Sequence, residues 1–294
     1  MSELVARVDG IELAYETFGD AGDPAVLLVM GLGAQMLLWE EDFCALLVEQ
    51  GRFVVRFDNR DVGRSSWIEG GPDPDILAAL QGDTSTASYK LEEMAGDAVG
   101  LLHHLEIDGA HVVGASMGGM IAQTIAIRHP QRVLSLTSIM STTGDPEVGK
   151  ARPEVLPLLL TPAPAELPSF VEYFVSLWRT LAGPAYPPDE ERLRTLAARV
   201  HERGVNPRGT GRQLLALLAS GDRTAALATV TAPTVVLHGE DDPLIDVSGG
   251  RATAAAIPGA QLTAFPGMGH DLPRELWPQI VELVATNAAS AQRG

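Results

Sequence analysis

The chain has 294 residues, of which 20% are charged and 46% belong to the hydrophobic set AVILMFWYC, as expected for a globular protein with a large core. Its formal net charge of −17 disfavours binding to nucleic acid or to anionic membranes, because phosphate groups are repelled by an acidic surface. Cys44 is the only cysteine, which excludes an internal disulfide and a thiolate metal cluster, and we expect it in the core.

The N-terminal segment lacks the features of a targeting sequence. It carries acidic residues in place of a basic region and has no long apolar stretch, so no signal peptide is predicted. No stretch of the chain reaches the length of an uninterrupted membrane span. A cytoplasmic location without a membrane partner is therefore the expectation.

The first 110 residues combine a hairpin with an alternation of buried strands and helices. Asp9-Gly10 is a two-residue turn signal between two runs with strand character. Continuous apolar runs of strand length indicate strands buried on both faces, and apolar residues at helical spacing indicate the helices between them. The predicted elements are strands at Leu4–Val8, Ile11–Thr17, Ala25–Met30 and Phe53–Phe57, helices at Leu37–Glu49 and Leu91–Leu105, and a surface excursion at Ile68–Ser88.

The stretch from Ala25 to Asp58 also imitates a dinucleotide-binding fingerprint. It has the order of elements that an NAD- or FAD-dependent oxidoreductase needs, which is a strand, Gly31-x-Gly33, a helix, a second strand and a terminal acid. Met36 stands where the third glycine is required, and that glycine permits close packing beside the pyrophosphate. A dinucleotide-dependent oxidoreductase is therefore kept only as a competing interpretation.

A strand, a sharp turn and a helix are predicted within AHVVGASMGGMIAQTIAIRH, residues 110–129. The apolar run from His111 to Val113 meets Gly-Ala-Ser-Met-Gly, and helical periodicity continues from Met120 to Ile127. Gly-x-Ser-x-Gly in this setting is a nucleophile elbow, in which small neighbours let the chain present an exposed hydroxyl at the C-terminal edge of a sheet. Ser116 is therefore the candidate nucleophile, although glycine and serine also occur together in ordinary turns.

The alternation stops after a strand at Val133–Met140 and resumes near residue 230. Between them, residues 141–222 are rich in proline and contain several helical stretches, which indicates an insertion. The elements predicted after it are strands at Ala232–His238 and Gln261–Phe265 and helices at Val247–Ala256 and Pro273–Ala288. The sequence therefore predicts an α/β core of residues 1–140 and 223–294 with a mostly parallel, doubly wound sheet, and a helical cap of residues 141–222.

A serine nucleophile needs a base within hydrogen-bond reach and an acid that orients the base. When the serine comes first along the chain, the order serine, acid, histidine requires a late histidine. His270 is the only histidine after residue 240, and it lies in a glycine-rich loop between a strand and a helix. Asp242 is the preferred acid, because Pro243 restricts its backbone at a strand end. Asp241 and Asp145 are the alternatives.

The tetrahedral intermediate of acyl transfer needs two hydrogen-bond donors for its oxyanion. The elbow supplies the backbone N–H of Met117, at the positive end of a helix. The second donor is expected from the loop Met30-Gly31-Leu32-Gly33, where flanking glycines allow the Leu32 N–H to turn back toward the nucleophile. A tight structural turn is the other interpretation of that loop.

Together these residues resemble the α/β-hydrolase superfamily over the whole chain except the insertion. GASMG stands at the nucleophile, HGEDDPLI at the acid loop and GMGH at the histidine. In VMGLG, Met30 replaces the histidine of the usual His-Gly-x-x-Gly, and in DNRDVGRS, Asp61 replaces a usual glycine. That combination is similar to the branch that includes aclacinomycin methylesterases. The resemblance implies the same catalytic set: nucleophile Ser116, acid Asp242, base His270, and oxyanion donors Leu32 and Met117.

The predicted function is hydrolysis of carboxylic esters, including methyl esters, of small to medium, largely apolar substrates through an acyl-enzyme. Lactone opening, carbon–carbon bond hydrolysis and cofactor-free perhydrolysis use the same triad, so the sequence does not separate them from ester hydrolysis. A ligand-binding homologue with negligible turnover is a further alternative. This chemistry needs no metal and no organic cofactor, the expected partner is the small-molecule ester, and the sequence leaves the oligomeric state open.

One segment of the cap combines helical periodicity with several aromatic residues. Apolar side chains recur at helical spacing from Leu167 to Leu181. A helix inserted after the strand that follows the nucleophile helix is expected to lie over the mouth of the site, where part of its apolar face would line a pocket. Phe174 and Trp178 are the candidate substrate-binding residues, and core packing explains the rest of the face.

Overall fold

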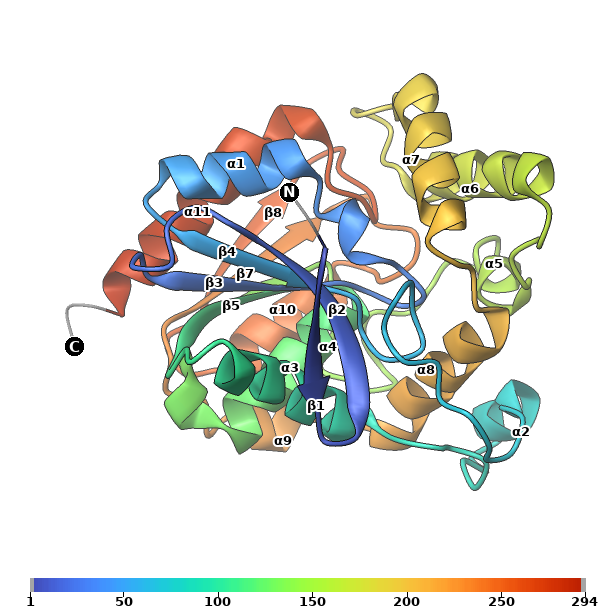
Figure 1. Cartoon of the computed structure of the whole chain (residues 1–294), viewed down its shortest axis with the longest axis horizontal. Helices are drawn as coiled ribbons and strands as arrows, with labels where there is room; N and C mark the ends of the chain where they lie inside the picture. Colours follow the sequence, from blue (N-terminus) through green and yellow to red (C-terminus); the bar gives the residue numbers. More distant parts are fainter. Residues whose placement is uncertain (1–2, 292–294) are drawn as a thin grey trace.

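The computed structural model describes residues 3–291, except the side chains of residues 159 and 160. Its centre is one eight-stranded sheet with the strand order β1-β2-β4-β3-β5-β6-β7-β8 (Figure 1). β2 pairs antiparallel with β1 and with β4, and all the other neighbouring strands are parallel. The strands are β1 (Leu4–Val8), β2 (Ile11–Phe18), β3 (Ala25–Val29), β4 (Phe53–Phe57), β5 (Ala110–Ala115), β6 (Val133–Ile139), β7 (Thr234–Gly239) and β8 (Gln261–Phe265). The predicted mostly parallel sheet is confirmed.

The strand sequences explain the places of the strands in the sheet. β3, β4, β5 and β7 are buried along their whole length and consist mostly of apolar residues, as strands covered on both faces must. The hairpin of β1 and β2 lies at the sheet edge and turns at Asp9 and Gly10. Their φ angles of 44° and 87° match a two-residue turn with two left-handed residues.

Helices cover both faces of the sheet. On one face lie α1 (Glu41–Glu49) and α11 (Trp277–Ser290), and on the other lie α3 (Leu91–His104), α4 (Met117–Arg128), α9 (Thr224–Leu227) and α10 (Ser248–Ala256) (Figure 1). The first pair buries an apolar cluster that includes Phe43, Cys44 and Trp277, and the second set buries one that includes Val112 and Ile121. None of the helices within residues 3–291 combines the length and the apolar character needed to cross a membrane.

The helix after β3 begins later than its apolar pattern predicts. The pattern predicts a helix from Leu37, whereas Met36–Leu38 forms a 3₁₀ turn and α1 starts at Glu41. Glu41 and Asp42 place negative charge at the positive end of the helix, which favours a start at this point. Gly31 and Gly33 therefore do not open a helix, and the helix that follows begins with two acidic residues, so this stretch lacks the helix N-terminus that holds a pyrophosphate in a dinucleotide site.

The terminal helix shows the same kind of difference. The prediction starts it at Pro273, whereas Arg274–Leu276 forms a 3₁₀ turn and α11 begins at Trp277. Pro278 lies in the first turn of α11, where the absence of an N–H costs no helical hydrogen bond. The predicted strand boundaries differ from the observed ones by one or two residues at most.

Between β6 and β7 the chain leaves the sheet and forms further helices (Figure 1). These are α5 (Leu156–Leu160), α6 (Leu167–Leu181), α7 (Glu190–Glu202) and α8 (Pro207–Ser220). α6 and α7 pack on each other around an apolar cluster that includes Phe170, Phe174 and Val200. The short α2 (Ile76–Leu80), which belongs to the excursion after β4, packs against α8.

Buried ion pairs join these inserted helices to the rest of the chain. Arg203, which follows α7, contacts Asp58 after β4 and Glu3 near the N-terminus, both at 2.7 Å. The Asp58 side chain is fully buried, so removal of Arg203 would leave an uncompensated charge in the interior. The position of α7 is therefore tied to the end of β4.

Asp61 forms a second connection of this kind. Its carboxylate accepts a hydrogen bond of 2.8 Å from the Tyr89 hydroxyl and contacts Arg212 of α8 at 3.3 Å. Its φ angle is 68°, in the left-handed region that glycine adopts freely and aspartate tolerates. The aspartate keeps the backbone conformation that a glycine would have and adds a buried anchor for α8.

Candidate active site

Ser116 occupies a sharp turn between β5 and α4. Its φ and ψ angles are 56° and −123°, a strained combination for a residue other than glycine. The Ser116 N–H donates to the Ile139 carbonyl at 2.9 Å and so fixes the turn against β6. A Cβ at Gly114 or Gly118 would lie 2.1 Å from the backbone oxygen of Gly118 or Val29, respectively. The Gly-x-Ser-x-Gly pattern is therefore required by the close approach of backbone segments around the serine.

His270 lies in the loop after β8, with its ring beside the serine. Its Nε2 is 2.9 Å from the Ser116 Oγ, and its Nδ1 is 2.7 Å from the Asp242 Oδ2. Because a carboxylate only accepts hydrogen bonds, Nδ1 carries the ring proton and the Nε2 lone pair faces the serine hydroxyl. The His270 N–H donates to the Leu181 carbonyl at 2.7 Å, so the end of α6 helps to hold this loop. The structure thus brings the three residues together in one hydrogen-bonded series.

Asp242 is buried directly after β7, and both of its oxygens have partners. Its Oδ1 accepts from the N–H groups of Leu244 and Ile245, each at 2.8 Å. The Nε2 of His238 lies 3.5 Å from the Oδ2 and donates to the Ile245 carbonyl at 2.8 Å. Burial alone would raise the pKa of Asp242, but His270 and His238 hold this pKa well below its ordinary value. An ionised carboxylate can stabilise a positive charge on His270.

The two alternative acids lie elsewhere. Asp241 accepts a hydrogen bond of 2.9 Å from the Gly267 N–H, and Asp145 accepts one of 2.8 Å from the Glu147 N–H. Neither carboxylate contacts His270 in the part of the chain that the structure describes. Both therefore stabilise turns, and neither is placed to orient the histidine.

The loop after β3 lies directly against the serine. A Cβ added to Gly31 would be 3.1 Å from the Ser116 Cβ, so the two backbones approach closely. Within residues 3–291, the backbone N–H groups of Leu32 and Met117 donate to no acceptor. Met117 is the first residue of α4, where N–H groups lack helical partners and the helix dipole favours an anion. Both of the donors expected from the sequence thus belong to segments that meet at Ser116.

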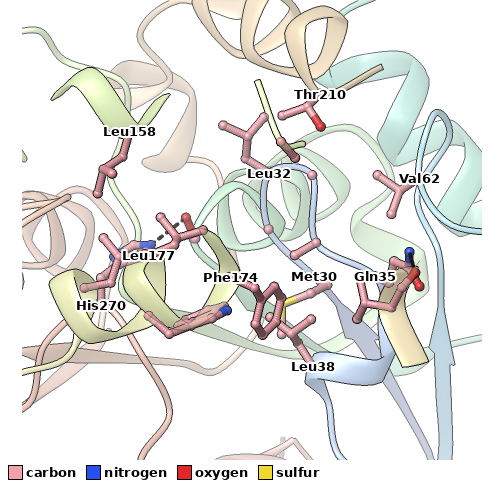
Figure 2. A pocket seen from close by; sticks show the side chains of 18 of the residues that line it. Met30, Leu32, Gln35, Leu38, Val62, Leu158, Phe174, Leu177, Thr210 and His270 are labelled. Carbon is pink, nitrogen blue, oxygen red and sulfur yellow. Dashed lines mark hydrogen bonds between the residues drawn. The ribbon is translucent and has the colours of Figure 1, made fainter. Parts of the chain in front are cut away.

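A pocket of about 1050 Å³ opens above the serine and the histidine (Figure 2). Its wall combines the loops after the strands with side chains of α5 to α8. α6 contributes four aromatic side chains to it, which are Phe170, Tyr173, Phe174 and Trp178. Pockets for small ligands usually occupy about 300–1,000 Å³, so this pocket has room for a bulky apolar group.

Asp271 also lines the pocket and was missed by reasoning from the sequence. Burial raises its pKa to about 7, although the neighbouring His270 opposes that shift. One oxygen of Asp271 is buried without a hydrogen-bond partner among the described residues. No sequence pattern distinguishes this aspartate from other loop acids, since burial of a loop side chain depends on the tertiary structure around it.

Comparison with known proteins gives one family. The model of the alpha/beta hydrolase fold matches residues 24–273. The chain is 29% identical to the rhodomycin D methylesterase of Streptomyces peucetius, and the alignment covers 96% of this chain and 97% of that protein. It is 29% identical to a putative carbamate hydrolase of Variovorax paradoxus, over 88% of this chain and 89% of that protein.

A solved structure gives the same result for the fold. The enol-lactonase from Burkholderia xenovorans superposes with a TM-score of 0.71 and is 22% identical, over 99% of this chain and 100% of that chain. At this level of identity the likeness concerns the arrangement of strands and helices. The likeness assigns no reaction or substrate, because one fold serves many functions.

Proposed function

The chain belongs to the alpha/beta hydrolase fold family, and we propose that it hydrolyses carboxylic esters with Ser116 as nucleophile, His270 as base and Asp242 as orienting acid. The observation that carries this proposal is the hydrogen-bonded series from Asp242 through His270 to Ser116, at 2.7 and 2.9 Å. A serine hydroxyl needs such a base to act as a nucleophile near neutral pH. The similarity to a methylesterase over nearly the whole chain supports an ester as the substrate.

In the acylation half of the proposed reaction, the Ser116 Oγ attacks the ester carbonyl carbon and the His270 Nε2 takes the hydroxyl proton. The N–H groups of Leu32 and Met117 stabilise the oxyanion of the tetrahedral intermediate, while Asp242 stabilises the imidazolium. The intermediate collapses as the C–O bond to the alcohol breaks. The imidazolium returns its proton to the departing alcohol, and the acyl group remains on Ser116.

In the deacylation half, water replaces the alcohol. His270 removes a proton from the water, and the resulting hydroxide attacks the acyl carbon through a second tetrahedral intermediate. The bond to the Ser116 Oγ then breaks, and the serine recovers its proton from His270. The products are one carboxylic acid and one alcohol, and no step draws on a metal or an organic cofactor.

The pocket supports a substrate with a bulky, apolar acyl part and a small alcohol. Its volume of about 1050 Å³ exceeds what a small ester occupies, so we propose larger substrates than the small to medium ones expected from the sequence. A methyl ester fits the division into one large and one small part, and the methylesterase relative supports it. We further propose that residues 141–222 form a cap domain on a core of residues 1–140 and 223–294, with Phe174 and Trp178 in contact with the acyl group.

A fluorophosphonate probe tests the proposed nucleophile directly. We expect one equivalent of the probe to modify Ser116 and to abolish ester hydrolysis in proportion to labelling, because the probe reacts with activated serines. Peptide mass spectrometry locates the modification. A parallel panel of methyl esters, nitrophenyl esters, lactones and epoxides gives the preferred reaction. Labelling at another residue, or full hydrolysis after complete labelling of Ser116, would contradict the proposal.

The substitution Phe174→Leu tests the role of the aromatic wall. We expect kcat/KM for a methyl ester of a polycyclic acid to fall about tenfold relative to methyl acetate, because a lost apolar contact affects only substrates that reach it. Phe174 is 6% exposed and lines the pocket, whereas Phe43 is 1% exposed and packs in the core on α1. Phe43→Leu is therefore the control for stability. An equal loss for both esters in the Phe174 variant would argue against selection by this side chain.

A further inference from the structure

A glutamine of α8 is bonded to the loop that carries the Leu32 N–H. Gln213 is fully buried, and its Oε1 accepts a hydrogen bond of 2.8 Å from the Gly33 N–H. Its Nε2 donates to the Arg60 carbonyl at 2.8 Å. These two partners fix the orientation of the Gln213 amide. The Gly33 N–H can donate only to the amide oxygen, and the Arg60 carbonyl can accept only from the amide nitrogen. Gln213 therefore joins the loop after β3 to the loop after β4.

The middle of the loop Met30–Met36 has few other backbone contacts. Side chains of the loop after β4 hold its two ends, through hydrogen bonds of 2.9 and 2.8 Å. Between these ends, the described backbone of residues 31–34 makes one internal bond, from the Ala34 N–H to the Gly31 carbonyl at 3.3 Å. The bond from Gly33 to Gln213 is shorter and comes from outside the loop. Gln213 thus holds the middle of the loop, which the hydrogen bonds at Met30 and Met36 constrain least.

The same segment is enclosed between α8 and the serine. A Cβ at Gly33 would lie 2.8 Å from the Thr210 Oγ1 of α8, and one at Gly31 would lie 3.1 Å from the Ser116 Cβ. Leu32 lies between Gly31 and Gly33 in the chain, and Figure 2 shows it with Thr210 on the same side of the cavity. A shift of α8 or of its bond to Gly33 therefore changes the direction of the Leu32 N–H relative to the serine.

We propose that Gln213 is a positioning residue for the oxyanion hole, through which α8 sets the direction of the Leu32 N–H. The inference rests on the proposed roles of Ser116 and Leu32. A donor aimed at charge that develops in the transition state contributes more to the chemical step than to substrate binding. Loss of Gln213 should therefore lower kcat and leave KM almost unchanged. The inserted helices then act on the reaction itself as well as on the choice of substrate.

Gln213→Met tests this, because methionine keeps the length and apolar volume of the side chain but neither hydrogen bond. We expect kcat to fall roughly tenfold to a hundredfold with KM within about twofold, since a misplacement of about 1 Å can cost about a hundredfold in rate. The Ki of an aryl trifluoromethyl ketone, which forms an oxyanion on Ser116, should rise by the same factor. Affinity for the carboxylic acid product should not change. Gln213→Glu keeps an acceptor for Gly33 and should retain more of kcat.

Gln123→Met is the matched control, because Gln123 is equally buried and also bonds through both ends of its amide, to Ser138 and Arg223 at 3.3 Å. The inference would be refuted if kcat for Gln213→Met lay within about threefold of kcat for this control. It would also be refuted if kcat fell while the affinity for the trifluoromethyl ketone stayed the same. If Gln213→Met does not fold, the same two measurements on Gln213→Leu decide, because leucine also lacks both hydrogen bonds. Hydrolysis retained by Ser116→Ala would instead refute the proposed function, so the two failures are distinguishable.

Discussion

Replacement of Ser116 by alanine should lower kcat for ester hydrolysis by about 10⁵- to 10⁶-fold, because the reaction then lacks its nucleophile and only binding and oxyanion stabilisation remain. The fold should persist, because among the described residues the Ser116 hydroxyl is hydrogen-bonded only to the His270 ring. Alanine can adopt the backbone angles of this turn as well as serine does. The measurement is release of acid from a methyl ester at constant pH, together with circular dichroism and the Tm.

Ser135→Ala is the control for loss of a buried hydroxyl. Ser135 lies on β6, is 2% exposed and contacts the Nδ1 of His111 at 2.9 Å, so its removal should affect stability without affecting turnover. Activity of Ser116→Ala within about tenfold of the parent protein would remove the serine from the mechanism.

Asp242→Asn should lower kcat by about 10⁴-fold while the backbone geometry stays the same. An asparagine can turn its amide nitrogen toward His270 and favour the tautomer whose Nε2 carries a proton, which cannot accept the serine hydroxyl proton. It also leaves the developing imidazolium without a negative partner. The depressed pKa of Asp242 means that the native carboxylate stays ionised well into the acidic range.

Asp241→Asn and Asp145→Asn are the matched comparisons, since each removes one charge from a loop near the same end of the sheet. Their carboxylates accept hydrogen bonds from the backbone N–H groups of Gly267 and Glu147, respectively. We therefore expect modest changes in Tm, and a kcat within about threefold of that of the parent protein. A loss in Asp145→Asn as large as that in Asp242→Asn would transfer the acid role. Steady-state kinetics at several pH values, with thermal melts, separates these outcomes.

The parts of the fold that could be predicted are those written in short sequence patterns. The strands of the sheet are continuous apolar runs, and the elbow at Ser116 needs two glycines within five residues. Asp242 could be preferred to its neighbour because Pro243 follows it at a strand end. The helix after β3 was predicted to begin too early, since the apolar residues Leu37 and Leu38 continue the helical pattern before the charged turn that starts α1.

The contacts that join the inserted helices to the rest of the chain could not be predicted in this way. Gln213 and Arg203 lie in unremarkable helical sequence, and their partners Gly33 and Asp58 are 180 and 145 residues away. No local pattern connects residues at such separations, because the pairing depends on how the helices dock on the sheet edge. Sequence reasoning therefore identified the groups proposed for the chemistry and missed the groups that hold them in place.

The long separations between these partners also bear on how the protein folds. Contacts between distant positions close large loops, so they form after the local helices and the hairpin. Ser116 and His270 are 154 residues apart, and the loop beside them is completed by a residue of α8. We therefore expect the site to be assembled late, after the helices that form its apolar wall. We expect slow refolding with losses to aggregation that increase with protein concentration, even where the folded protein is stable.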